Sequence, residues 1–232
     1  TTSDAMEGVG AMQLDYSVHN SEAWGGYTKI FHYANPFGEG TGSPVEGTWI
    51  LAPEAGALMV GPEAGNGDWW SSSEEDVTTR ACLFDDEYVF GADGSFQNVL
   101  QDETWNETWQ DGVDTEGCGA PVAPHDGSNA ATYVHDAAAG TITLSGLGAF
   151  LGLAKAITGG ELSTAGTEVP ETRTYEVLPT AVGELKVAIS TGGGYWTFTF
   201  VEVVPELNLA GILDSIPLTI SEYLLSEAIF FE

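Results

Sequence analysis

Basic side chains are scarce in this sequence: its 232 residues include only 5 Lys and Arg against 35 Asp and Glu. The formal net charge is therefore −30 at pH 7. A protein that grips nucleic acid through its phosphates needs several cations on one face, and this composition does not supply them. An anionic membrane surface would repel the chain for the same reason. Such a charge is best tolerated where salt screens it or where divalent cations bind.

Long apolar runs, histidines and cysteines are also few. No apolar run reaches the roughly 18 residues that a membrane-spanning helix needs. With 4 histidines, and with neither a His-Glu-x-x-His nor a Gly-x-Ser-x-Gly motif, the common zinc-peptidase and serine-hydrolase signatures are absent. The two cysteines, Cys82 and Cys118, are expected to pair in an exported protein, which would stabilise the fold by roughly 3–4 kcal/mol. The alternative is two buried free thiols.

Short strand-like segments dominate what is present. Hydrophobic residues make up 43% of the chain, enough for a core, and 30 glycines and 10 prolines indicate many turns. Three pairs of segments predict hairpins: Tyr88–Phe90 with Ser95–Leu100, Thr132–His135 with Thr141–Leu144, and Leu185–Ser190 with Tyr195–Val203. About a dozen strands without intervening amphipathic helices predict an all-β fold, an antiparallel β-sandwich or jelly roll.

The composition divides the chain into four parts. Residues 1–36 hold two candidate strands, Met12–His19 and Gly26–Tyr33, and residues 37–47 form a Gly/Pro-rich linker. Residues 48–204 carry the predicted sandwich, in which 148–157 fits either a strand or a short helix. Residues 205–232 are strongly apolar. Their pattern fits either a helix or one or two strands. We expect that last segment to be buried, on this chain or on a neighbouring one.

Tryptophans cluster in a polar context. Successive residues of a strand point to opposite faces, so one ring of the Trp69-Trp70 pair is expected to reach a surface. Aromatic rings stack on the apolar faces of sugars while neighbouring carboxylates and amides bond the hydroxyls. We therefore select Trp69, Trp70, Trp105 and Trp109 as candidate glycan-binding residues. The alternative for each is ordinary packing in the core.

Acidic residues cluster in the same stretch of the chain. Oxygen ligands at high density suit Ca²⁺, and the best candidates are Asp85, Asp86 and Asp93, because a hairpin turn would bring them together. The alternative is a solvated acidic face.

Two enzyme-like patterns are weaker. Glu103 and Glu107 would suit glycoside hydrolysis if this segment is helical, since positions i and i+4 share one face, whereas an extended segment separates them by about 13 Å. The glycines of 146–152 superficially match a dinucleotide-binding loop, but the surroundings are β-rich. They fit tight turns and close sheet packing better.

Four runs in combination resemble a known module: Trp69–Ser71, Arg80–Phe90, Trp105–Gln110 and Cys118–Gly127. The chain from about Thr48 to Val203 is similar to a β-sandwich module that recurs in secreted, multimodular proteins of marine bacteria, often beside polysaccharide-degrading or glycan-binding domains. The N-terminal residues 10–27 resemble the opening strands of a jelly-roll carbohydrate-binding module. The resemblance implies an extracellular, non-catalytic and carbohydrate-associated role.

We therefore expect a non-catalytic protein of the cell exterior or surface that binds a polysaccharide and requires no cofactor beyond possible calcium. The first alternative is a fibre subunit whose terminal segments complete the sheet of another copy by β-strand addition. The second alternative is a glycoside hydrolase. Polysaccharide or further copies of the chain are the expected partners, with no nucleic acid and no membrane insertion.

Overall fold

The computed structural model describes residues 11–13, 30–32 and 45–204. The apolar segment 205–232 and most of the N-terminal extension, on which predictions were made above, lie outside this range. Two short strands, β1 (Ala11–Gln13) and β2 (Ile30–His32), pair antiparallel with each other. Among the described residues, no helix is long and apolar enough to span a membrane.

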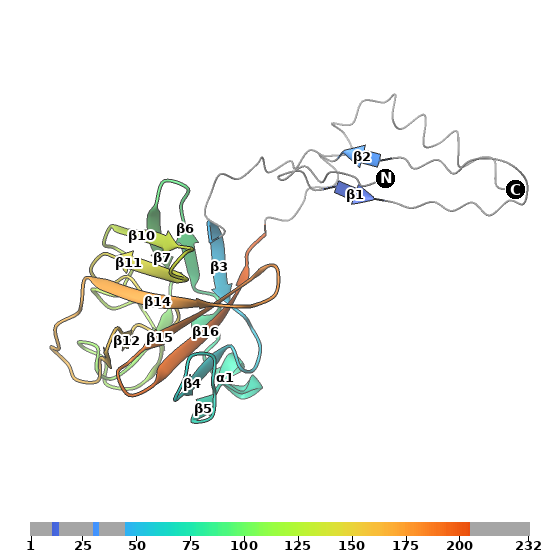
Figure 1. Cartoon of the computed structure of the whole chain (residues 1–232). Helices are drawn as coiled ribbons and strands as arrows, with labels where there is room; N and C mark the ends of the chain where they lie inside the picture. The colour runs from blue at the N-terminus through green and yellow to red at the C-terminus, as the bar shows by residue number, and fades with distance from the viewer. Residues whose placement is uncertain (1–10, 14–29, 33–44, 205–232) are drawn as a thin grey trace, which may run out of the picture.

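The remaining elements follow from residue 47 onward (Figure 1). They are β3 (Gly47–Leu51), β4 (Leu58–Gly61), β5 (Trp70–Ser71), α1 (Glu74–Thr79), α2 (Ala81–Phe84), β6 (Glu87–Phe90), β7 (Ser95–Val99), β8 (Thr104–Asn106), β9 (Gly117–Gly119), β10 (Ala131–Asp136), β11 (Thr141–Ser145), β12 (Ala156–Ile157), β13 (Gly160–Glu161), β14 (Thr172–Leu178), β15 (Glu184–Ser190) and β16 (Tyr195–Glu202). The all-β, antiparallel class predicted from the sequence is confirmed.

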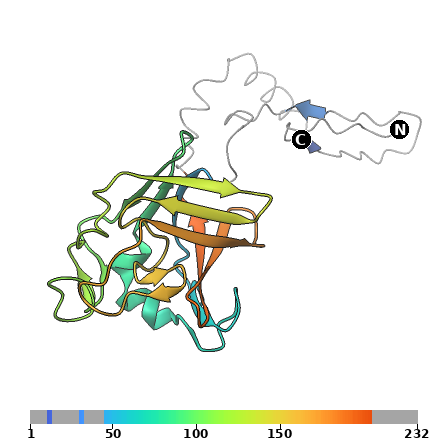
Figure 2. The same cartoon turned by 60° about the vertical axis from the view of Figure 1, so that its left-hand side comes forward.

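Eight strands close into a barrel, which corrects the expectation of a two-layer sandwich or jelly roll. The order is β3-β6-β7-β10-β11-β14-β15-β16, and β16 pairs back onto β3 through Phe200 with Leu51. Figures 1 and 2 show β10, β11 and β14 forming one wall, which crosses β15 and β16 at a steep angle. All three predicted hairpins form. Their strands follow one another round the barrel, so the connections stay short.

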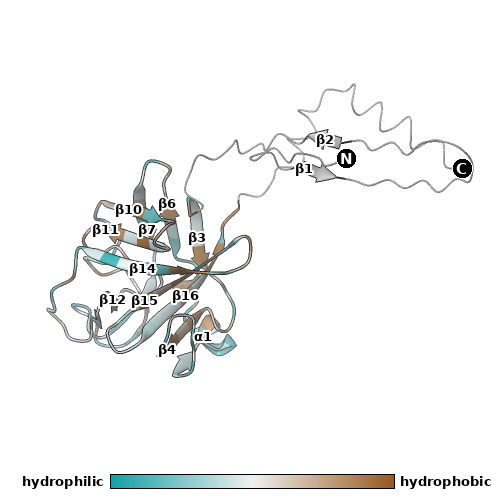
Figure 3. Ribbon diagram, viewed as in Figure 1, coloured by the Kyte–Doolittle hydropathy of each residue, from teal (hydrophilic) through white to brown (hydrophobic). Residues whose placement is uncertain are grey.

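Strand alternation fills the barrel with large side chains. Buried residues recur at every second position, as with Tyr88 and Phe90 on β6 and Phe198 and Phe200 on β16. Figure 3 shows the hydrophobic residues gathered mainly on the barrel strands. Edge-to-face ring contacts, such as Tyr88 with Phe200 at 5.0 Å between centroids, pack the interior densely.

In the segment 148–157, left open between strand and helix, residues 148–155 form an irregular, largely buried loop, and the last two residues form the short strand β12. The interior side chains of Asn98, Tyr175 and Tyr88 bond its backbone: Asn98 Nδ2 donates to Phe150 O (2.9 Å), Leu151 N donates to Tyr175 Oη (3.0 Å) and Tyr88 Oη donates to Gly152 O (3.1 Å). These bonds satisfy the polar groups of a buried loop.

Glycine is required inside this loop. Gly152 adopts φ +70°, and a Cβ on it would overlap the ring of Phe198. Gly148 adopts φ +84°, and a Cβ on it would overlap the carbonyl of Pro124. The glycines of 146–152 therefore serve turns and close packing, as predicted.

Candidate functional site

Trp69 and Trp70 point to different environments, as the alternation of strand side chains predicts. Trp70 is half-buried at the start of β5, with its ring 6.0 Å from that of Trp196 on β16. Trp69 is 58% exposed. It is the aromatic residue among the exposed large hydrophobic side chains of the described part of the chain. The two neighbours therefore have separate roles, Trp70 in packing and Trp69 at the surface.

Trp69 is held in place although it is exposed. A Cβ on Gly194 would overlap the far edge of the Trp69 indole, so the ring lies directly against the bare backbone of the β15–β16 hairpin. The backbone N–H of Trp69 donates to Val60 O (3.1 Å), which fixes the start of the side chain. An indole fixed at one edge and open to solvent over more than half its surface is a preorganised stacking platform.

The loop before Trp69 supplies polar groups beside it. Asn66 Nδ2 donates to Asp68 Oδ2 (3.0 Å), and Asp68 N donates to Asn66 Oδ1 (2.7 Å), which gives the loop a fixed shape. Gly65 N donates to Thr197 Oγ1 on β16 (2.9 Å) and anchors the loop to the barrel. Carboxylate and amide oxygens at such positions can accept hydrogen bonds from a ligand's hydroxyl groups.

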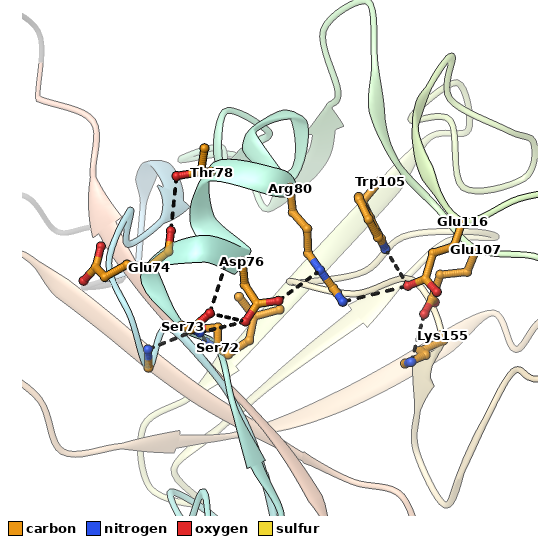
Figure 4. A network of polar contacts seen from close by, with 12 residues as sticks. Ser72, Ser73, Glu74, Asp76, Thr78, Arg80, Trp105, Glu107, Glu116 and Lys155 are labelled. Atoms are coloured by element: carbon orange, nitrogen blue, oxygen red, sulfur yellow. Dashed lines mark hydrogen bonds and ion pairs between the residues drawn. The ribbon is translucent and has the colours of Figure 1, made fainter.

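A second aromatic group surrounds Arg80, which lies between Trp70 and Trp105. The guanidinium carbon is 4.5 Å from the Trp105 ring centroid and 5.8 Å from that of Trp70. Carboxylates hold it from two sides, Asp76 at 3.9 Å and Glu116 at 3.9 Å. Trp105 Nε1 also donates to Glu116 Oε1 (3.1 Å), so Figure 4 shows Asp76, Arg80, Glu116 and Trp105 as one connected row.

The local sequence explains how Arg80 reaches this position. Ser73 caps α1: its Oγ accepts from Asp76 N (3.2 Å), and Ser73 N donates to Asp76 Oδ2 (2.8 Å), a capping box. The hydrogen bonds that Ser73 donates to the Asp76 carboxylate, first from its backbone N–H and then from its Oγ, lower the pKa of Asp76. Asp76 stays ionised and faces Arg80 four residues later.

The disulfide fixes the other half of the Arg80 group. Cys82 on α2 is bonded to Cys118 on β9, which confirms the predicted pairing. Cys118 is the register partner of Trp105 across the β8–β9 ladder. The cross-link therefore joins the residue two positions after Arg80 to the residue opposite Trp105. This arrangement keeps the cation and the ring together.

Trp109 belongs to a third group, centred on Glu107. Trp109 Nε1 donates to Glu107 Oε2 (2.9 Å), and Lys155 Nζ donates to Glu107 Oε1 (2.8 Å). The Lys155 ammonium also lies 5.0 Å from the Trp196 ring centroid. Trp109 packs edge-on against His125, with centroids 5.4 Å apart. Both oxygens of Glu107 are engaged, and the side chain is buried.

Below this surface, Arg173 and His125 form a buried pair. Arg173 is 1% exposed and donates to Ala154 O (2.7 Å) and Ala156 O (3.1 Å). Its Nη2 lies 3.1 Å from His125 Nε2, and because a guanidinium only donates, the ring nitrogen accepts. Burial, together with this cation, lowers the pKa of His125 to about 3. His125 is therefore a neutral structural histidine.

The predicted calcium ligands are placed in different environments. Asp86 is fully buried, and Thr104 Oγ1 donates to its Oδ2 (2.6 Å), while its Oδ1 has no hydrogen-bond partner. Burial raises the pKa of Asp86 to about 8. Asp85 is exposed after α2, and Asp93 accepts from Ser95 Oγ (2.6 Å) in the β6–β7 turn. The described residues contain no group of three or more His, Cys, Asp or Glu side chains able to hold a metal ion. Calcium binding stays a prediction without a ligand set.

The paired carboxylates of the hydrolase alternative are not brought together on one helical face. Residues Thr104–Asn106, between Glu103 and Glu107, form the strand β8. Glu103 is exposed, whereas Glu107 is buried in the contacts described above. The helical condition on which this alternative depended is therefore not met.

Sequence reasoning missed the cations that pack against aromatic rings in this region. Arg80, Lys155 and Arg173 are three of only 5 basic residues in the chain, and each one contacts an aromatic ring. Their rarity was the available signal. An Asp76–Arg80 spacing of four residues was another, but α1 itself was not predicted.

Comparisons with protein-family models, curated proteins and solved structures found no match to this chain.

Proposed function

We propose that this chain is a non-catalytic glycan-binding protein of the cell exterior, with Trp69 as its central contact. The observation that carries the proposal is the exposed indole of Trp69, fixed against Gly194 and flanked by the polar loop of Asn66 and Asp68. The fixed indole offers a flat apolar face to solvent, and sugar rings offer flat C–H faces of matching size.

The other selected tryptophans support the site instead of forming it. Trp70 and Trp105 hold Arg80 between them, and Trp109 is occupied by Glu107 and His125. These contacts hold Trp70, Trp105 and Trp109 in the packed structure and leave Trp69 as the exposed ring. A rigid platform lowers the ordering cost of binding, which favours recognition of a repetitive, weakly binding polymer.

An exterior location fits the cross-linked pair Cys82–Cys118, since disulfides persist in oxidising compartments. It also fits the net charge of −30, which dissolved salt would screen.

Self-assembly by β-strand addition is the weaker proposal. Strand addition requires an open sheet edge, and the eight barrel strands are paired on both sides. In the ten-stranded sheet, the two-residue strand β5 is the end strand and so has one unpaired edge. The terminal segments on which that proposal depended lie outside the described residues.

The test is affinity electrophoresis of the full chain in gels containing a panel of polysaccharides, followed by titration calorimetry with each polysaccharide that retards it. We expect retardation by at least one glycan, and at least a tenfold loss of affinity in Trp69→Ala. The matched control is Val134→Ala, another exposed apolar side chain (65%), located on β10. No retardation by any glycan, or equal loss in both variants, would overturn the proposal.

A further inference from the structure

The charges around the tryptophans narrow the class of glycan. Resting on the proposed function, we infer that the Trp69 surface selects uncharged polysaccharides and rejects those carrying sulfate or uronic acid groups. Stacking alone does not discriminate between these classes, because both offer C–H faces. The discrimination comes from the charged and polar groups that a bound chain would meet.

The cations nearest the tryptophans are already neutralised by the protein's own carboxylates. Arg80 lies between Asp76 and Glu116, and both of these carboxylates are partly exposed. Lys155 donates to Glu107 at 2.8 Å. An anionic glycan would have to displace a carboxylate that is held by helix capping, by an indole N–H or by burial. That exchange replaces one ion pair by another and gains little.

The remaining cations of the described residues are placed elsewhere. Arg173 is buried, and its two terminal nitrogens are bonded to the carbonyls of Ala154 and Ala156 and to His125. Lys186 on β15 pairs with Thr199, in the half of β16 far from the hairpin at Gly194. Neither can serve as a counter-charge for a ligand stacked on Trp69.

The groups beside Trp69 are acceptors and carry negative charge. Asp68 is exposed and adjacent in the chain, and Glu63 is exposed in the same loop. Ionised carboxylates accept hydrogen bonds and donate none, so they complement the hydroxyl groups of a neutral sugar. Sulfate and carboxylate groups of a sugar are acceptors too, so they would meet Asp68 with both charge repulsion and mismatched hydrogen bonding.

The experiment compares matched polymers: soluble neutral β-glucans and dextran against sulfated derivatives prepared from the same polymers, by calorimetry on the full chain. At 50 mM NaCl we expect the sulfated form of any glucan that binds to bind at least tenfold more weakly than the neutral form. Raising NaCl to 500 mM should leave neutral binding within twofold and narrow the gap, because salt screens the repulsion.

A charge variant isolates the cause. Asp68→Asn keeps an acceptor oxygen and removes the charge, so it should raise the relative affinity for the sulfated polymer severalfold. The matched control is Asp136→Asn on β10, which should leave the ratio unchanged. Equal or tighter binding of the sulfated polymers, with a Trp69→Ala loss, would overturn this inference and leave the proposed function standing. Absence of binding to every polymer in both series and to every glycan of the wider panel would overturn both.

Discussion

Two glycines of this protein each leave room for an aromatic ring, one in the buried core and one at the surface. Inside the barrel, Gly152 leaves room for Phe198, which is fully buried. On the surface, Gly194 leaves room for Trp69, which stays 58% exposed. Both bring an aromatic ring against bare backbone. The difference teaches that close packing of a ring identifies a rigid position, whereas exposure decides whether that position serves stability or contact with a ligand.

The largest loss of stability is expected from a substitution of Gly152, inside the barrel. Gly152→Ala would place a methyl group on the Phe198 ring at a φ of +70°, so we expect a loss of about 4 kcal/mol in unfolding free energy, measured by urea denaturation. The matched control is Gly166→Ala, which has a similar φ of +78° and no atom within 4 Å of the added Cβ. It should cost about 1 kcal/mol. Equal losses would show that the overlap with Phe198 does not matter.

Asp86 tests whether buried polar groups of the interior limit stability. Its pKa is raised to about 8 in the folded protein, so its stabilising contribution is complete below the unfolded pKa of about 3.9 and is lost as the pH rises through 8. His125 acts in the opposite direction, because its stabilisation is present above about pH 6.5 and is lost as the pH falls toward 3. Between pH 6.5 and 8, Asp86 is therefore the group of this pair that changes stability.

We expect the unfolding free energy of the wild type to fall by about 2 kcal/mol from pH 6.5 to 8 through Asp86, and Asp86→Asn to abolish this fall. The variant keeps an acceptor for Thr104. The exposed Asp111 provides the control, since Asp111→Asn should leave the slope unchanged. A slope that survives in Asp86→Asn would mean that this carboxyl is ionised in the folded protein.

A substitution of Gly194, on the surface, is expected to affect stability less than one of Gly152 and glycan affinity more. Gly194→Ala would displace the Trp69 ring and press the added methyl group against the carbonyl of Gly61, so we expect a loss of about 2 kcal/mol in unfolding free energy together with most of the glycan affinity. Gly193→Ala, where no atom lies within 4 Å of the added Cβ, should change neither. Retained affinity in Gly194→Ala would show that the position of the ring is not what binding requires.

Much of the strand content was predictable because it is local. Alternation in Tyr195–Val203 and the glycines at 192–194 identify a hairpin within a few residues of sequence, and the β15–β16 pairing confirms it. Closure was not predictable in the same way. The β3–β16 pairing joins Leu51 to Phe200 across most of the domain, and no periodicity distinguishes a closed barrel from two packed sheets.

The candidate surface was predictable by residue type and not by arrangement. The clustering of tryptophans in a polar context identified Trp69, but the position of the exposed ring depends on Gly194, which is 125 positions away in sequence. The helix α1 was missed although Ser73 and Asp76 have the spacing of a capping box. The burial of Asp86 could not be inferred, because its neighbour Asp85 carries the same side chain and is exposed.

One measurement tests the central claim most directly: the dissociation constant for a neutral glycan that retards the wild type, measured on Trp69→Ala and Trp69→Phe beside their unfolding free energies. The account predicts that Trp69→Ala loses at least tenfold in affinity while its stability changes by less than about 0.5 kcal/mol. Trp69→Phe, which keeps a stacking ring, should recover much of that affinity. Affinity unchanged in Trp69→Ala, or lost only in step with stability, would contradict the claim that this exposed ring is the contact for the glycan.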